Sequence, residues 1–112
     1  MKIRFKDGTE LKVISIKQNI DHNTFFNNKL NNTTVVLNAN ENEGVTVESL
    51  KESLTPDNVS EVTYIREAGN ITDSFVRFAK IVQNIDEYGN QIMILLSKDE
   101  YVANPYTDLE EN

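Results

Sequence analysis

The sequence predicts an α+β fold dominated by β-structure: a mostly antiparallel sheet or small sandwich of about six strands, with one short helix near residues 46–54. Apolar and polar residues alternate along several short stretches, with the period of two that is typical of a half-buried strand. Turn-forming Gly and Asn residues separate these stretches. Only residues 46–54 combine a helix cap with apolar residues four positions apart.

The first seventeen residues predict a hairpin that turns at Asp7-Gly8. A two-residue loop would place Glu10 opposite Phe5, with a charge on the apolar face. A type I turn with Gly8 in the left-handed G1-bulge position avoids this conflict. Because a slip of one residue moves every side chain to the other face, we expect the second register. It pairs Phe5 with Thr9, Ile3 with Leu11 and Met1 with Val13. Beyond Val13 the apolar positions shift to Ile14 and Ile16, which predicts a bulge.

Residues 18–44 are rich in asparagine, which occupies nine of the 24 positions from 19 to 42. Asparagine favours turns and is depleted in strands. Two apolar groups interrupt the region, Phe25-Phe26 and Val35-Val36-Leu37. We expect a strand at residues 33–38 and loop elsewhere.

The predicted helix begins after Thr46, a suitable N-cap, and carries Glu48 in its first turn. Leu50 and Leu54 share one face. Pro56 disfavours helical geometry at the residue before it, so we expect the helix to end near position 53 or 54. Two turns are too few for a stable isolated helix, so it should dock on a sheet.

Further strands are predicted at residues 62–65, 75–82 and 92–96, separated by turns at 68–70 and 88–90. The stretch 92–96 is apolar at every position, so this strand should be central or covered on both faces. We expect one globular domain over residues 1–98, followed by an acidic C-terminal tail over 99–112.

The composition argues against several classes of function. The chain has 112 residues, a net charge of −7, no Cys and one His. The negative charge argues against a nucleic-acid partner, because phosphate contacts require a basic face. No apolar run reaches the length of a membrane span, and the first residues lack the apolar core of a secretory signal. Without Cys, disulfides and thiolate chemistry are excluded.

No residues with a catalytic, cofactor-binding or metal-binding pattern stand out, so we expect no enzyme, no cofactor and no small-molecule substrate. His22 lies in the Asn-rich region without a marked nucleophile or second ligand. Asn38, Asn40 and Asn42 imitate a calcium loop, but they lack its carboxylates and Gly44 is one position late. The acidic pairs are adjacent doublets at 86–87, 99–100 and 110–111, an arrangement typical of solvated charge.

Self-association is the predicted mode of action. The core is small, and one helix covers only part of a sheet face, so residues 91–96 should leave apolar surface for a second copy. We expect Phe75, Ile92 and Ile94 at the centre of this contact.

The opening residues 1–9, a short strand that leads into the Asp7-Gly8 turn, resemble small proteins from the tail region of phages and prophages of Gram-positive bacteria. So do residues 50–65, with a Leu-x-x-x-Leu helix followed by Thr-Pro-Asp-Asn and a strand, then Gly-Asn-Ile-Thr at 69–72 and a last hairpin. These stretches cover about half the chain, and their motifs are turns and strands. The Asn-rich residues 18–44 depart from that pattern.

The resemblance implies a non-enzymatic virion or tail-assembly protein, such as a baseplate accessory protein, that contacts itself and other tail proteins. Such a protein would be found in the cytoplasm of a bacterial host during assembly, and the finished virion is a second expected location. The composition keeps an alternative open: an acidic binding module, such as an immunity protein or an inhibitor, that neutralises a basic partner.

Overall fold

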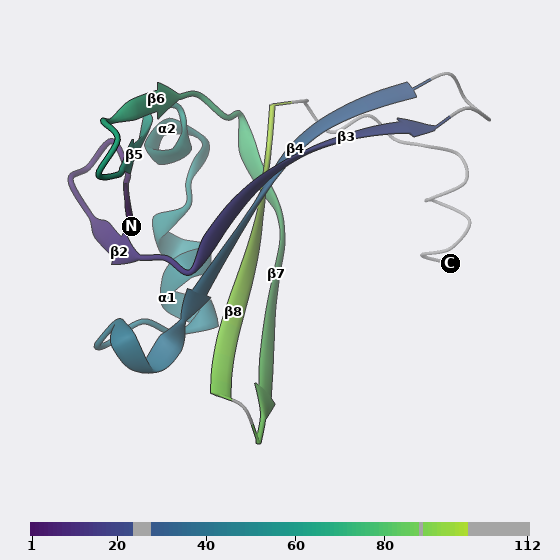
Figure 1. The fold of residues 1–112 in the computed structure, drawn as a ribbon. Coiled ribbons are helices and arrows are strands. Elements are labelled where there is room, and N and C mark those ends of the chain that lie inside the picture. The colour runs from purple at the N-terminus through teal and green to yellow at the C-terminus, as the bar shows by residue number, and fades with distance from the viewer. Residues whose placement is uncertain (24–27, 88, 99–112) are drawn as a thin grey trace.

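The computed structural model describes residues 1–23, 28–87 and 89–98, and gives only the backbone for residues 19–23 and 28–31. The described residues form eight strands in two antiparallel four-stranded sheets (Figure 1). The first sheet has the order β2-β1-β5-β6 and contains β1 (Lys2–Arg4), β2 (Glu10–Lys12), β5 (Val62–Ile65) and β6 (Ile71–Asp73). The second has the order β3-β4-β8-β7 and contains β3 (Ser15–Asn23), β4 (Asn28–Asn38), β7 (Arg77–Asp86) and β8 (Gly89–Ser97). The predicted fold class is confirmed.

The first hairpin has the predicted register, with Ile3 opposite Leu11. The Phe5 amide donates to the Thr9 carbonyl at 2.9 Å, and Gly8 has a φ of +92°. The bulge that the sequence predicted after Val13 is not formed within this hairpin. It leaves the first sheet there and enters the second at Ser15.

The predicted loop over most of residues 18–44 is wrong, because β3 and β4 form a long hairpin through this region. Only residues 33–38 were expected as strand, and they are the second half of β4. Ile16 opposite Val35 anchors the hairpin at its apolar end, and the backbone ladder continues outward to Asn23 and Asn28. A continuous ladder outweighs the weak strand propensity of asparagine. Phe25 and Phe26 lie outside the described residues.

The predicted helix is confirmed as α1 (Val47–Ser53). The Thr46 hydroxyl accepts from the Ser49 amide at 3.0 Å, and the Ser49 hydroxyl accepts from the Thr46 amide at 2.9 Å, so the two residues form a capping box. Leu50 and Leu54 are buried as expected. The 3₁₀ turn η1 (Ala39–Glu41) precedes this helix.

A second short helix, α2 (Pro56–Val59), was not predicted. Its start was readable from the sequence, since Thr55 caps it and Pro56 occupies the first turn. Pro56 was expected only to end the preceding helix, but it also begins α2.

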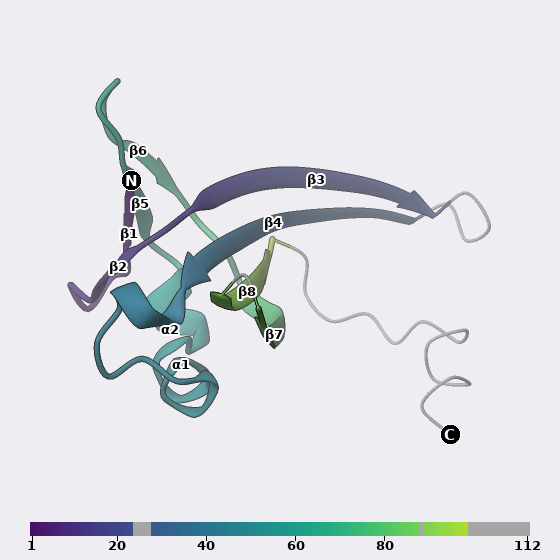
Figure 2. The same cartoon turned by 60° about the horizontal axis from the view of Figure 1, so that its bottom comes forward.

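One apolar core joins both sheets and the helices. The first sheet and the helices lie on the same side of the second sheet (Figures 1 and 2). The first sheet contributes Ile3, Leu11, Val62 and Tyr64; the second contributes Val35, Leu37, Ile92, Ile94 and Leu96; and the helical segment contributes Leu50, Leu54 and Val59. Strand β8 lies between β4 and β7, so its predicted central place is confirmed. Its second face is exposed in part: Met93 is 47% exposed, whereas Leu95 is half-buried and Ser97 is buried.

The Gly8 turn gives a direct test of the register. Gly8→Val should lower stability by about 1–2 kcal/mol, because a β-branched residue does not readily adopt a positive φ. Thr9→Val, at an exposed neighbouring position, is the matched control. Thermal unfolding of both variants is the measurement, and equal melting temperatures would contradict the G1-bulge turn.

Candidate functional site

The three residues predicted to mediate contact lie in the core. Phe75 and Ile94 are each 1% exposed, and Ile92 is 0% exposed. Their side chains pack within the chain and have no surface to offer a partner. The alternate residues of β8 face the other way, so the candidate contact surface is the outer face of the second sheet.

The outer face is organised in rows across the sheet, because directly paired residues of antiparallel strands point to the same side. In the first row, Met93 lies between Val36 of β4 and Val82 of β7. In the second row, Leu95 lies between Thr34 and Lys80. Met93 and Val82 are exposed, whereas Val36 and Leu95 are half-buried. Four apolar side chains therefore form a continuous patch over three adjacent strands, which we call the outer patch.

Cationic residues border the outer patch. Lys17 of β3 is paired with Thr34, so Lys17 and Lys80 end the second row at the two edges of the sheet. Arg77 is paired with Ser97 and ends a third row. The described members of these rows include no carboxylate. In a chain with a net charge of −7, these three rows are locally positive.

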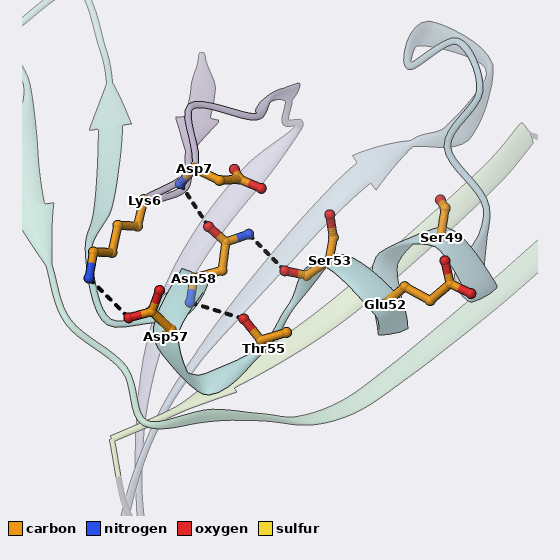
Figure 3. A pocket seen from close by; sticks show the side chains of 8 residues that line it. All are labelled: Lys6, Asp7, Ser49, Glu52, Ser53, Thr55, Asp57 and Asn58. Carbon is orange, nitrogen blue, oxygen red and sulfur yellow. Dashed lines mark hydrogen bonds and ion pairs between the residues drawn. The ribbon is translucent and has the colours of Figure 1, made fainter.

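A hollow on another part of the surface has a different character. A groove of about 590 Å³ runs between the first hairpin and the helices (Figure 3). Lys6 and Asp57 face each other across it, with Nζ and Oδ1 2.9 Å apart, and this contact raises the pKa of Lys6. Hydrogen bonds from Thr9 lower the pKa of Asp7. These charged groups are exposed and form an ion pair or hydrogen bonds with neighbouring residues. We therefore interpret the groove as a structural contact between the hairpin and the helices, and call it the seam.

Asn58 holds this seam together from a buried position. Its Oδ1 accepts from the Asp7 amide at 2.9 Å, and its Nδ2 donates to the Ser53 carbonyl at 2.7 Å (Figure 3). One side chain thus ties the turn of the first hairpin to the end of α1.

Asn42 makes an equivalent bridge at the other end of the hairpin. Its amide accepts from the Lys12 N–H at 2.8 Å and donates to the Lys12 carbonyl at 3.0 Å, in the manner of a neighbouring strand. The Asn38 side chain accepts from the Asn40 amide. The asparagines that imitate a calcium loop therefore serve as caps and bridges.

A second polar cluster joins the end of β8 to the first sheet. Lys98 Nζ lies 2.7 Å from Asp73 Oδ1 and 5.8 Å from the centre of the Phe75 ring. The Tyr64 hydroxyl lies 3.5 Å from Asp73 Oδ2. Burial, together with the Asp73 charge, raises the pKa of Tyr64 well above its usual range, so the phenol stays protonated.

The remaining sequence candidates do not converge on a site. In the described part of the chain, no three His, Asp or Glu side chains are grouped to hold a metal ion. The His22 side chain and the acidic pairs at 99–100 and 110–111 lie outside the described residues. No described helix has the length and apolarity needed to cross a membrane.

A comparison with protein-family models, with curated protein sequences and with solved structures finds no match for this chain.

The Asn58 bridge can be tested by substitution. Asn58→Ala should cost about 1–3 kcal/mol, because the partly buried Asp7 N–H and Ser53 carbonyl lose their partner. Asn40→Ala, at an exposed position, should change stability by no more than about 0.5 kcal/mol. Chemical denaturation of both variants provides the comparison. Identical midpoints would show that the bridge contributes nothing.

Proposed function

We propose that this chain is a non-enzymatic protein that acts through protein–protein contacts, with the outer patch as its contact surface. One observation carries the proposal: Val36, Val82, Met93 and Leu95 form contiguous apolar surface that no described element covers. Single exposed apolar residues are common on protein surfaces. A contiguous patch bordered by polar residues is typical of an interaction site.

A second copy of the chain and other subunits of an assembly are the proposed partners. Small domains gain stability when association buries additional apolar surface. The outer patch lies on a sheet whose edge strands, β3 and β7, are long. An extended apolar face of this kind suits packing against another sheet, the arrangement found between sheets in sandwiches.

The assembly we propose is a phage or prophage tail. The resemblance of residues 1–9 and 50–65 to small tail-region proteins supports this. These stretches comprise β1 with its turn, and the chain from the second half of α1 through α2 to β5. A tail is built from repeated subunits, for which a contact surface without catalysis is sufficient. If the proposal holds, the gene lies among genes for tail-tape, fibre or baseplate proteins.

A second candidate function follows from the helical segment. Residues 39–61 carry six carboxylates and a single cation, Lys51. Glu48 and Glu52 are exposed on α1. Such a surface suits the alternative of an acidic module that neutralises a basic partner. An adjacent toxin gene, and loss of binding to its product on reversal of Glu48 and Glu52, would support this candidate over the tail component.

Substitution in the outer patch tests the favoured proposal. In about 0.5 M salt the Debye length is about 4 Å, so repulsion between the cationic borders of two copies is screened. We expect the full chain to self-associate under these conditions. Met93→Glu should raise the dissociation constant at least about tenfold, because a carboxylate in an apolar contact loses its hydration.

The matched control is Ile85→Glu, which places the same charge at a residue that is 71% exposed and lies near the end of the β7–β8 hairpin. It should leave association unchanged. Light scattering coupled to size exclusion, over a range of concentrations, measures both variants. A 12.8 kDa monomer at every concentration would reject self-association through this face.

A further inference from the structure

The C-terminal segment of the chain begins at one end of the outer patch. Strand β8 carries Met93 and Leu95 of the patch and ends at Ser97, in the same row as Arg77. Lys98 is held by Asp73 and lies over the Phe75 ring. The described part of the chain therefore ends next to the row of Arg77, and residues 99–112 follow it in the sequence.

The composition of this segment is complementary to the face beside it. Its 14 residues contain five carboxylates and no Lys, Arg or His, together with Tyr101, Val102, Tyr106 and Leu109. The outer face has the reverse pattern, with apolar side chains bordered by Lys17, Arg77 and Lys80. The segment holds most of the net negative charge, since residues 1–98 carry 13 acidic and 11 basic residues.

Residues 99–112 are also long enough to span the outer face. Fourteen residues reach about 46 Å when extended, at about 3.3 Å per residue. The outer face from Ser97 back to Gln91 measures about 20 Å, because six residues of a strand separate them. Tethering at Lys98 gives the segment an effective concentration in the millimolar range at this face.

We propose that residues 99–112 bind the outer patch of their own chain and cover it in the free protein. Two copies that meet face to face would bring their cationic borders together, whereas the acidic segment brings opposite charge and apolar side chains. This inference concerns the same surface as the proposed function and rests on it.

The two methionines of the chain make the test specific. Met93 lies in the outer patch, whereas Met1 lines a separate hollow beside Ile71 and Asp73. The experiment records the ¹³C-methyl NMR signals of both methionines in dilute protein at low salt. The test variant of the full chain replaces the five carboxylates of the segment with amides: Asp99→Asn, Glu100→Gln, Asp108→Asn, Glu110→Gln and Glu111→Gln. We expect the Met93 signal to shift in this variant and the Met1 signal to stay in place.

The matched control neutralises five exposed carboxylates of the helical segment, so that the net charge changes equally: Glu41→Gln, Glu43→Gln, Glu48→Gln, Glu52→Gln and Glu61→Gln. It should leave the Met93 signal unchanged. Truncation after Lys98 provides a second variant. It retains the whole described core, which lies between Ile3 and Leu96, and should shift the Met93 signal as the amide variant does. Lys80→Gln should cause part of that shift, and Lys51→Gln none.

Identical Met93 signals in the full chain, the amide variant and the truncated chain would overturn the proposal. A Met93 signal that changes with protein concentration at low salt would also overturn it, because a second copy would then be the occupant. Neither result would affect the proposed function, which is tested separately by Met93→Glu in high salt, where the electrostatic attraction of the segment is screened.

Discussion

The side chains between the two sheets come from alternate positions of each strand, and this alternation decides what each strand presents to the outside. In β8, Ile92, Ile94 and Leu96 fill the core, so Met93 and Leu95 must face outward. The helices and the first sheet occupy the inner side of the second sheet. The described chain has no further layer for the outer side. The same strand therefore supplies both the centre of the core and the centre of the outer patch.

The first sheet is small, with strands of three or four residues, and hydrogen bonds from two buried amides help to hold it in place. Asn58 joins the hairpin turn to α1, and Asn42 takes the place of a neighbouring strand beside Lys12. Their polar atoms are paired, as burial requires. The apolar core and these two bridges together explain how so short a hairpin remains docked while the second sheet keeps an open face.

Local patterns predicted the fold class, the register of the first hairpin and the extent of α1, because turn chemistry, capping and side-chain period act over a few residues. They failed for residues 18–32, where a ladder anchored by Ile16 and Val35 overrides the turn preference of asparagine. The contact residues were also misplaced. The run 92–96 is apolar throughout, so its inward side cannot be read without the register to β4 and β7. That register places Met93 between Val36 and Val82.

The proposed covering of the outer patch in solution, by the chain's own segment or by a partner, can be measured at Met93 itself. Met93 and Met1 provide an internal comparison, since they are 47% and 49% exposed in the described fold. Mild peroxide oxidation of the full chain, followed by peptide mass spectrometry, gives the rate of sulfoxide formation at each residue. If the outer patch is covered, Met93 should oxidise several times more slowly than Met1, and the two rates should converge in denaturant. Equal rates in the native protein would contradict it.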